Sequence, residues 1–338
     1  MADSTSALAA RQLVMGYQST HLLTVVCKLG LADLLRDGPR DSTELASLTG
    51  ANVDALHRVL RALAQLGVLE QSPVGRFALT PIGDCLRSNR PDSLCPVALF
   101  HGHEMIQRAW GEMLYSVMTG DTAFEQVFGM PAFDYLEANP EAAAIYDAGM
   151  GQMTARTAPE VVAAYDFADF DTIVDVGGGA GVLLAEILRG HPRPRGIVFD
   201  LPHACPSAEN TMRDAGLVER MRFEGGDFFK SIPAGGDCYV LRHIVHDWGD
   251  GPVGEILRSC RQVVPAHGRL LLVEAVMPAE GEPGREYVML DIMMLVRVGG
   301  RERTEAEYRT LIERAGFHLE RVIPTSARFS ILECMVAT

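Results

Sequence analysis

The chain has 338 residues, of which 48% are apolar and 22% are charged, and its formal net charge is −14. This apolar content excludes a disordered chain, and the length exceeds the roughly 150 residues of one typical domain. No apolar run approaches the roughly 20 residues of a membrane-spanning helix, and the acidic surplus argues against nucleic acid, because it repels phosphate backbones.

The cysteines and the N-terminus indicate a cellular compartment. Seven cysteines are scattered along the chain without a C-x-x-C pair, which favours free thiols in a reducing environment over a disulfide framework. The first residues, "MADSTSALAARQL", do not combine a charged segment with an apolar core, as a secretory signal does. We therefore expect a cytoplasmic protein.

Residues 1–95 are predicted to be mostly helical. The segments "HLLTVVCKLGLADLL" and "NVDALHRVLRALAQLGVLE" have helical periodicity, and "SPVG" predicts the turn of a hairpin. Helices followed by a hairpin suggest a winged-helix module. Its second long helix offers Asp54, His57, Arg58 and Arg61, which include only two certain cations. A dimerisation or packing module is therefore favoured, and a DNA-binding regulator is the weaker alternative.

Residues 96–165 are also predicted to be helical, and they are rich in methionine and aromatic residues. Examples are "MIQRAWGEMLYSVM" and "AAAIYDAGMGQM". Such residues most often form a core, but adaptable methionines also suit a cleft for a flat apolar ligand. The pattern leaves both interpretations open.

From residue 166 the pattern changes to α/β. The short apolar strands "TIVDVG", "RGIVFDLP", "MRFEGGDFF", "CYVLRHIVHDW" and "RLLLVEAVMP" alternate with helical segments. This alternation predicts a mostly parallel, doubly wound sheet. The tail, "FHLERVIPTSARFSILECMVA", predicts two strands joined by a turn, which would close the sheet as an antiparallel pair.

Polar residues stand at the expected carboxyl ends of successive strands, where doubly wound sheets bind their ligands. In chain order they are Asp175, Asp200, Asp227, His246 and Glu274. Each follows the previous one by about one strand–helix repeat. The sequence therefore predicts that these side chains meet along one edge of the sheet and form the functional site.

The glycine run "DVGGGAG" is the most distinctive of these strand ends. A dinucleotide fingerprint would need a third glycine where Val182 or Leu184 stands, and a P-loop would need a lysine that the run lacks. The acid at its head, Asp175, would repel a pyrophosphate. An acid beside a tight glycine turn better suits a cationic amino-acid ligand.

The next two strand ends point to a nucleoside. Asp200, in "IVFDLP", can accept hydrogen bonds from both ribose hydroxyls. Asp227 and Phe228, in "GGDFF", would place a carboxylate and a ring near a purine. The alternatives are a helix-capping role for Asp227 and core packing for Phe228.

These motifs carry a family resemblance. The ordered set "VDVGGGAG", "FDLP", "GDFF", "LRHIVHDWGD", "LLLVEAVMP" and "GGRERTEAEY" resembles the S-adenosylmethionine-dependent O-methyltransferases of small aromatic molecules, over nearly the whole chain. The resemblance implies a Rossmann-like methyltransferase domain over residues 166–338 and a winged-helix-like dimerisation domain over residues 1–95. Between them, residues 96–165 would form a helical connector that contributes to the acceptor pocket. It also implies a homodimer.

The resemblance assigns roles by position. His246 matches the general base, Glu274 and Glu302 match the acids that hold its imidazole, and Asp247 is the acid beside it. The S-adenosylmethionine contacts would come from Asp175, Gly177, Gly179, Asp200, Asp227, Phe228 and Arg242, the last replacing a lysine common in relatives. The substrate pocket would include Trp110, Met150, Met294 and Arg297.

The chemistry explains why a histidine and carboxylates are needed. The methyl carbon of the sulfonium is already electrophilic, but a phenol of pKa ~10 is a poor nucleophile at neutral pH. A histidine of pKa ~6.5 can take its proton as transfer begins, which contributes about 10²–10⁴-fold. Carboxylates at the other ring nitrogen would fix the tautomer and favour the imidazolium that forms.

Several alternatives remain open. His243, His246 and Asp247 could suggest a metal site, but residues three apart on a strand or turn are not expected to converge, and no metal is predicted. Arg297 either contacts a carboxylate or second phenolate of the acceptor or forms a surface salt bridge. A relative of the same fold that acts as a hydroxylase, decarboxylase or C-methyltransferase is the alternative function.

Overall fold

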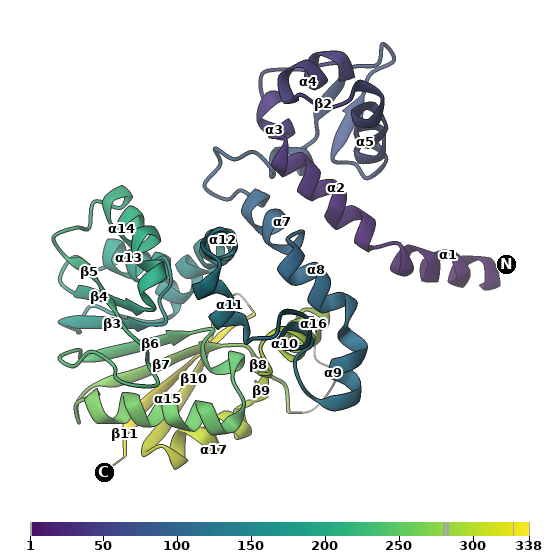
Figure 1. Ribbon diagram of the computed structural model, residues 1–338. Helices are drawn as coiled ribbons and strands as arrows, with labels where there is room; N and C mark the ends of the chain where they lie inside the picture. Colours follow the sequence, from purple (N-terminus) through teal and green to yellow (C-terminus); the bar gives the residue numbers. More distant parts are fainter. Residues whose placement is uncertain (1, 280, 282–283, 327, 338) are drawn as a thin grey trace. The chain divides into compact units, whose positions relative to one another are not determined.

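The computed structural model describes residues 2–279, 281, 284–326 and 328–337. The chain divides into two compact units (Figure 1). The N-terminal unit comprises residues 1–107 and 148–152. The C-terminal unit comprises residues 108–147 and 153–338.

The N-terminal unit has the predicted order of helices followed by a hairpin. A capping box starts α4, where Asp41 accepts backbone hydrogen bonds and Glu44 reciprocates. The side chains of Leu45, Leu60 and Phe77 are fully buried in its core. Its elements are α1 (Ala2–Val14), α2 (Tyr17–Lys28), α3 (Leu31–Leu34), α4 (Ser42–Thr49), α5 (Val53–Gln65), β1 (Leu69–Gln71), β2 (Phe77–Leu79), α6 (Pro81–Asp84) and α7 (Cys95–His101).

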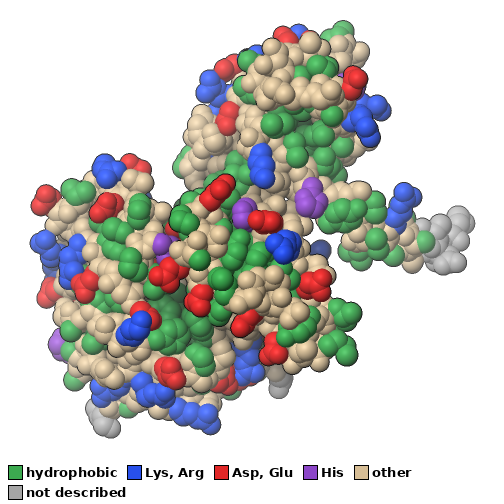
Figure 2. Space-filling model, viewed as in Figure 1, with side chains coloured by type: hydrophobic (Ala, Val, Ile, Leu, Met, Phe, Trp, Pro, Cys, Tyr) green, Lys and Arg blue, Asp and Glu red, His purple; other side chains and the backbone are tan. Residues whose placement is uncertain are grey.

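The surface of this unit has charges of both signs. Asp54, Arg58 and Arg61 are exposed on α5, the helix that a winged-helix DNA-binding protein would use for recognition. Figure 2 shows basic and acidic side chains interspersed on the visible face of each unit. This mixture does not form the basic stripe that a DNA-binding helix presents to a phosphate backbone.

The middle of the chain is helical, as the sequence predicts. Among the described residues no helix, including the 25-residue α12, is long and apolar enough to cross a bilayer. The helices here are α8 (Glu104–Gly111), α9 (Met113–Thr119), α10 (Ala123–Phe128), α11 (Ala132–Ala138) and α12 (Pro140–Ala164).

The C-terminal unit is built on a seven-stranded sheet (Figure 1). Its order is β5-β4-β3-β6-β7-β11-β10, in which β5 to β7 are parallel and β11 and β10 are antiparallel. This confirms the doubly wound sheet and the antiparallel C-terminal pair. The strands are β3 (Thr172–Val176), β4 (Arg195–Asp200), β5 (Met221–Gly225), β6 (Cys238–Arg242), β7 (Arg269–Glu274), β10 (Phe317–Pro324) and β11 (Ser330–Val336), and a small parallel pair joins β8 (Val276–Met277) to β9 (Arg303–Thr304).

Helices cover both faces of the sheet because its strands are apolar on both sides. Ile173 packs into one core with α12, α13 and α14, whereas its neighbour Val174 packs into the other with α15 and α17. This continuous burial explains the unbroken apolar runs of the central strands. The helices are α13 (Val182–Gly190), α14 (Cys205–Asp214), α15 (Asp250–Val263), α16 (Arg285–Arg297) and α17 (Glu305–Arg314), with short 3₁₀ turns η1 (Pro202–Ala204) and η2 (Val245–Asp247).

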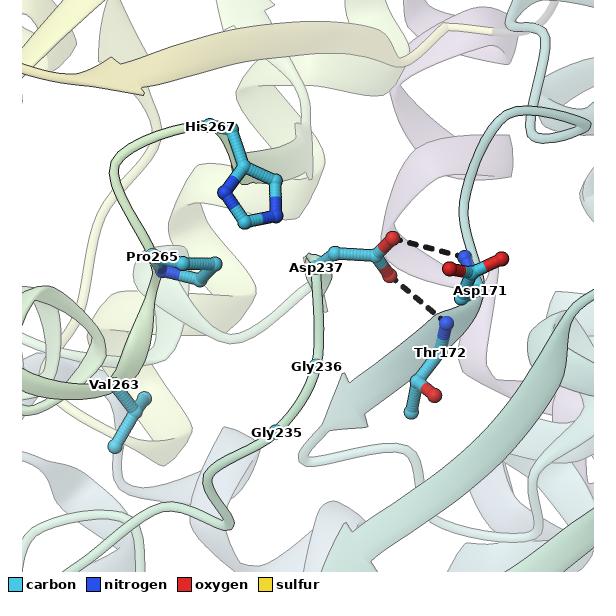
Figure 3. A pocket seen from close by; sticks show the side chains of 8 residues that line it. All are labelled: Asp171, Thr172, Gly235, Gly236, Asp237, Val263, Pro265 and His267. Atoms are coloured by element: carbon cyan, nitrogen blue, oxygen red, sulfur yellow. Dashed lines mark hydrogen bonds between the residues drawn. The ribbon is translucent and has the colours of Figure 1, made fainter.

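A carboxylate fixes the amino-terminal edge of the sheet. Asp237 accepts hydrogen bonds from the backbone N–H groups of Asp171 (2.9 Å) and Thr172 (2.8 Å), at the start of β3. These residues line a pocket together with Pro265 and His267 (Figure 3). It lies at the amino ends of the strands, whereas doubly wound sheets bind their ligands at the carboxyl ends. We therefore assign Asp237 a structural role.

Candidate active site

The turn between β3 and α13 requires its glycines. Gly177, Gly179 and Gly181 have φ angles of 70°, 54° and 70°, in the left-handed region that side chains disfavour. A Cβ on Gly177 would lie 2.3 Å from Cδ1 of Ile244, whereas a Cβ on Gly179 would meet nothing within 4 Å. The turn is therefore tightly packed on one side and open at Gly179, which gives a ligand access to the backbone.

Two acids flank this turn. Asp175 lies within β3 and is 3% exposed, and burial raises the pKa of its carboxyl to about 7. Its Oδ2 atom has no hydrogen-bond partner among the described residues. Asp200, at the end of β4, accepts hydrogen bonds from the N–H groups of Gly179 (2.7 Å) and Leu201 (2.6 Å). A buried carboxylate oxygen without a partner, beside an open glycine turn, fits the cationic amino-acid end of S-adenosylmethionine.

The two residues that the sequence predicts to contact adenine lie just beyond β5. Asp227 accepts a hydrogen bond from the Phe229 N–H (2.9 Å) and pairs with Lys230 (3.1 Å). The Phe228 ring lies 4.9 Å from the ring of Phe229 and 6.3 Å from that of Trp248, centroid to centroid. Asp227 thus caps a turn rather than a helix. The adenine contacts of Asp227 and Phe228 stay predictions.

Arg242 ends β6 and ties the sheet to α12. Its two terminal nitrogens donate hydrogen bonds to the hydroxyls of Thr154 and Thr157, both at 2.7 Å. Burial lowers the pKa of the guanidinium to about 10, while Asp175 and Glu274 favour its charged form. Arg242 therefore supplies positive charge beside the glycine turn, and its contact with the cofactor stays a prediction.

His246 lies in the turn η2, four residues beyond the end of β6. The sequence placed it at a strand end, but the strand stops at Arg242. The imidazole is 4% exposed. Its Nδ1 atom lies 2.7 Å from Oε1 of Glu302, and its Nε2 atom lies 3.6 Å from Oδ1 of Asp247. Glu302 therefore holds one ring nitrogen by a hydrogen bond, and the other faces Asp247 at a longer distance.

Glu274, at the end of β7, acts mainly on the backbone of this turn. It is fully buried, and its Oε1 atom accepts hydrogen bonds from the N–H groups of Ile244 (3.1 Å) and Val245 (2.8 Å). Its Oε2 atom lies 3.8 Å from Nδ1 of His246. The predicted pair of acids around the imidazole is therefore present, but only Glu302 is within hydrogen-bond distance.

The carboxylates decide the charge of the imidazole. Burial on its own would lower the pKa of His246, but Glu274, Asp247 and Glu302 raise it to about 9. Burial in turn raises the pKa of Glu274 to about 7 and raises that of Asp247, although His246 opposes both shifts. The carboxylates around the imidazole therefore favour its protonated form, against the effect of burial.

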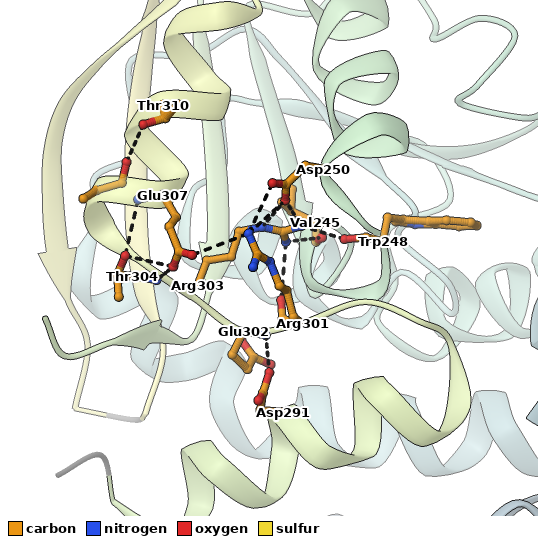
Figure 4. Close-up of polar contacts among 11 residues, drawn as sticks. Val245, Trp248, Asp250, Asp291, Arg301, Glu302, Arg303, Thr304, Glu307 and Thr310 are labelled. Atoms are coloured by element: carbon orange, nitrogen blue, oxygen red, sulfur yellow. Dashed lines mark hydrogen bonds and ion pairs between the residues drawn. The ribbon is translucent and has the colours of Figure 1, made fainter. Parts of the chain in front are cut away.

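The segment "GGRERT" clamps the turn that carries His246 (Figure 4). Arg303 is fully buried and donates hydrogen bonds to the carbonyls of Val245 (3.1 Å) and Trp248 (2.7 Å) and to Asp250 (2.8 Å). The Arg301 N–H donates to the His246 carbonyl (2.9 Å). Glu302 thus reaches the imidazole because the residues on either side of it bind the turn.

Sequence reasoning missed most of this clamp. The motif drew attention to Glu302, whereas Arg303 and Asp250 were not among the predicted site residues. Gly300 was missed too, although a Cβ there would lie 1.9 Å from the His246 carbonyl oxygen. The double glycine of "VGGRER" was the signal, because a glycine off a turn often marks a close backbone approach.

Replacing Arg303 with methionine should destabilise the fold without removing any ionisable group from the His246 cluster. We expect a loss of about 2–4 kcal/mol in the free energy of unfolding, because two buried carbonyls lose their donor at about 1–3 kcal/mol each. Denaturant unfolding monitored by circular dichroism measures it. Arg314→Met, on the exposed side of α17, is the control and should change stability by less than about 0.5 kcal/mol. Equal stability of the two variants would contradict the clamp.

Arg297 is not on the surface, so the surface salt bridge considered from the sequence is wrong. Arg297 is the last residue of α16, and it is 6% exposed. The guanidinium carbon lies 4.7 Å from the ring centroid of Tyr146, and its charge acts on Asp247, where it favours the carboxylate. Arg297 therefore belongs to the His246 cluster by position.

The rings of His243 and His246 do converge, contrary to the expectation from their spacing. Their centroids lie 5.0 Å apart, because His243 adopts a φ of 56°, which turns the chain between the end of β6 and η2. The His243 ring also packs edge-on against Phe329 at 4.2 Å. Within the described ranges, no three His, Cys, Asp or Glu side chains are arranged to hold a metal ion.

The other predicted pocket residues lie on three helices. Trp110 is half-buried on α8, Met150 is half-buried on α12, and Met294 is buried on α16, one turn before Arg297. Met150 belongs to the N-terminal unit and Met294 to the C-terminal unit. Their part in an acceptor pocket stays a prediction.

The sheet order, the open glycine turn beside Asp175 and the buried imidazole–carboxylate cluster are together those of an S-adenosylmethionine-dependent methyltransferase. The chain belongs to the O-methyltransferase family. The O-methyltransferase domain matches residues 110–318, and the O-methyltransferase dimerisation domain matches residues 11–89. The protein is therefore an O-methyltransferase, and S-adenosylmethionine is its cofactor.

Similar proteins cover nearly the whole chain. The phenazine O-methyltransferase PhzM of Lysobacter antibioticus is 47% identical over 95% of this chain and 94% of its own length. The O-demethylpuromycin-O-methyltransferase of Streptomyces alboniger is 41% identical over 95% of this chain and 87% of its own length. The crystal structure of LaPhzM superposes with a TM-score of 0.94, at 45% identity, and covers 98% of this chain and 99% of that one.

Proposed function

We propose that this enzyme methylates a hydroxyl group of a small aromatic natural product and that His246 is its general base. The observation that carries this proposal is the imidazole itself. Its Nδ1 atom is held 2.7 Å from Glu302, which leaves Nε2 as the atom that can exchange a proton with an acceptor. The similarity to phenazine and O-demethylpuromycin methyltransferases supports an aromatic acceptor.

The proton transfer is well matched in energy. A phenol has a pKa of about 10, and the three carboxylates raise the pKa of His246 to about 9. The acceptor O–H bond breaks, its proton moves to Nε2, and the oxygen forms the new bond to the methyl carbon. The bound cofactor supplies that electrophilic methyl group from its sulfonium, which becomes a neutral thioether. Glu302 and Glu274 stabilise the positive charge that stays on the imidazole.

The cofactor would be held by the residues that the resemblance implies. Asp175 and the turn at Gly177 and Gly179 would bind the amino-acid end, and Asp200 the ribose. The supporting observations are the Asp175 oxygen without a partner and the open space at Gly179. Asp227, Phe228 and Arg242 would complete this site.

Residues 96–165 would contribute the acceptor side of the pocket. The guanidinium carbon of Arg297 lies 4.7 Å from the centroid of the Tyr146 ring, and the Phe133 ring stacks on that of Trp248 at 5.6 Å. Trp248 follows Asp247 directly in the chain. These aromatic side chains from the middle region therefore lie beside the proposed base, where a flat acceptor would need apolar walls.

The protein would act as a homodimer through its N-terminal unit. The match to the dimerisation domain supports this assembly. Leu8, Leu13 and Val14 are 57%, 75% and 73% exposed on α1, and Tyr17 at the start of α2 is 58% exposed. Exposed apolar side chains that follow one another along two successive helices are consistent with such an interface.

A panel of aromatic acceptors with isotope-labelled S-adenosylmethionine tests the proposed function. Matched phenols and anilines of the same ring system are needed, because one relative, the phenazine-1-carboxylate N-methyltransferase of Pseudomonas aeruginosa, is named for a nitrogen acceptor and is 30% identical over 95% of this chain. We expect the label on oxygen, located by NMR of the product. Label only on nitrogen or carbon would refute the proposal.

The pH dependence of kcat/KM should follow the ionisation of His246. The carboxylates favour the imidazolium and raise the pKa of His246 to about 9, so the reactive neutral form grows as pH rises, and kcat/KM should increase up to about pH 9. Glu302→Gln removes one of these charges and should move the midpoint about one unit lower, toward the ordinary value near 6.5. Two phenols of different acidity separate this effect from ionisation of the acceptor. An unmoved midpoint in the variant would contradict the assignment.

A further inference from the structure

Asp291 is an acid near the middle of α16 that the proton-transfer chemistry does not use. Its Oδ1 atom accepts a hydrogen bond from the backbone N–H of Glu302 at 2.8 Å, although the two residues lie 11 positions apart in the chain (Figure 4). Between them, α16 ends at Arg297, and the chain turns at Gly299, which has a φ of 75°. Asp291 therefore attaches the residue that contacts the imidazole to the helix α16.

The carboxylate of Glu302 makes one hydrogen bond to the base. Its Oε1 atom lies 2.7 Å from Nδ1 of His246, whereas its Oε2 atom has no hydrogen-bond partner among the described residues. The position of Oε1 therefore depends on the backbone from which the side chain extends. Such a support matters because catalytic groups have to be held within about 0.5 Å of their productive geometry.

The backbone around Glu302 is held on two sides. The N–H of the preceding residue, Arg301, donates to the His246 carbonyl at 2.9 Å, and the N–H of Glu302 itself donates to Asp291. The first bond attaches the segment to the turn η2, and the second attaches it to α16. Loss of either bond would let the segment rotate about the other, because the glycines before it do not restrict the backbone.

We propose that Asp291 is a positioning residue for methyl transfer, because by fixing the backbone of Glu302 it keeps the carboxylate in hydrogen-bond contact with Nδ1 of His246. The effect on the rate rests on the proposed function, since it assumes that His246 takes the acceptor proton. The dependence of the Glu302–His246 hydrogen bond on Asp291 holds whatever His246 does. A residue that only stabilises the loop after α16 would give different results.

The kinetic test separates the acceptor oxygen of Asp291 from its charge, and it uses an acceptor identified in the panel. Asp291→Ala removes both and should lower kcat about 10- to 100-fold, because a shift of about 1 Å in a catalytic group can cost about 10²-fold. Asp291→Asn keeps an oxygen that can accept the Glu302 N–H, so its kcat should stay within about 3-fold of the wild type. The affinity for S-adenosylmethionine should be unchanged in both variants.

Asp291→Glu is the reciprocal variant, because it keeps the charge and displaces the acceptor oxygen by one methylene. It should lower kcat by about 3- to 10-fold, and it gives the same comparison if Asp291→Ala does not fold. A loss of activity in Asp291→Asn with full activity in Asp291→Glu would show that the charge matters and not the hydrogen bond, which would overturn the inference.

The pH dependence of kcat/KM provides a readout that a purely structural role would not move. Glu302 favours the imidazolium of His246, so its displacement in Asp291→Ala should lower the midpoint, whereas Asp291→Asn should keep it. The other charged groups around the imidazole, which all variants retain, are Glu274, Asp247, His243 and, acting on Asp247, Arg297. A lower melting temperature with wild-type kcat and midpoint would show that Asp291 is only structural.

The hydrogen bond itself can be observed without turnover. In enzyme that contains isotope-labelled histidine and is bound to S-adenosylhomocysteine, the Nδ1–H proton of His246 is identified by NMR through its absence from His246→Gln. Its resonance should be shifted or broadened in Asp291→Ala and unchanged in Asp291→Asn. Glu286→Ala is the control and should also leave it unchanged, because this acid on the first turn of α16 has a side chain that is 76% exposed.

The failure of the inference and that of the proposed function have different signatures. If the resonance changes in Asp291→Ala while kcat and the pH midpoint do not, the positioning of Glu302 stands and the general-base role of His246 is refuted. If the resonance is unchanged in a folded Asp291→Ala, the role of Asp291 is refuted and the proposed function stands.

Discussion

Replacing His246 with alanine is expected to lower kcat by about 10²–10⁴-fold, the usual contribution of a general base. The reason is that the acceptor loses the group that takes its proton, while the proposed cofactor residues at the glycine turn are untouched. Single-turnover transfer from labelled S-adenosylmethionine measures the chemical step. Cofactor affinity, measured by calorimetry, should stay within about 3-fold of the wild type, because the variant changes no proposed cofactor contact.

Two control variants distinguish a loss of the general base from a loss of folding. His246→Ala leaves the buried Glu274 and Glu302 without their cation, so His246→Gln, which keeps a polar side chain against Glu302, should also be measured, with the melting temperature of each. His267→Ala, an exposed histidine at the opposite edge of the sheet, should keep full activity. A well-folded His246 variant that methylates within about 3-fold of the wild-type rate would end the general-base assignment.

Gly300→Ala is expected to have an effect of similar size, although the residue touches no substrate. The new Cβ would lie 1.9 Å from the His246 carbonyl oxygen and 2.4 Å from the Asp247 carbonyl carbon. These are backbone atoms, so the turn η2 has to move. A shift of about 1 Å in a catalytic group can cost about 10²-fold in rate, and overpacking costs about 1–3 kcal/mol in stability.

The matched control for this prediction lies in the same region of the chain. Gly251, near the start of α15, has no atom within 4 Å of the position that a Cβ would take. Gly251→Ala should therefore leave kcat unchanged and keep or slightly raise the melting temperature. If Gly300→Ala is as active and as stable as Gly251→Ala, the contact between "GGRER" and the His246 turn is not tight.

The edge of the sheet where the parallel strands end could be predicted, because it follows from the local pattern of apolar and polar residues. Apolar strands alternating with helices predict a parallel sheet, and the carboxyl ends of parallel strands meet at one edge. The glycine turn followed from the same logic, since Gly177, Gly179 and Gly181 all need a positive φ. Asp175 and Asp200 therefore lie where the sequence placed them.

The turn that carries His246 could not be predicted from local sequence pattern. The apolar run "CYVLRHIV" looks like one strand, but β6 ends at Arg242 and His243 reverses the chain with a φ of 56°. That reversal is held by Glu274 and Arg303, which lie 29 and 58 residues from Val245 in the chain. Contacts at such separations leave no periodicity in the sequence.

The burial of two arginines could not be predicted from the sequence either. Arg297 and Arg303 look like surface residues because arginine is rarely buried unless it is paired. The guanidinium of Arg297 lies over the Tyr146 ring. Arg303 donates hydrogen bonds to Asp250 and to carbonyls of the turn that carries His246. Only the folded arrangement shows that both belong to the site.

The most direct test is a crystal structure of the enzyme with S-adenosylhomocysteine and a hydroxylated aromatic acceptor identified in the panel. The claim that His246 removes the acceptor proton predicts the hydroxyl oxygen within about 2.6–3.2 Å of Nε2, with Nδ1 still bound to Glu302. An acceptor whose only hydroxyl lies against another side chain, with Nε2 of His246 directed away from it, would contradict the account.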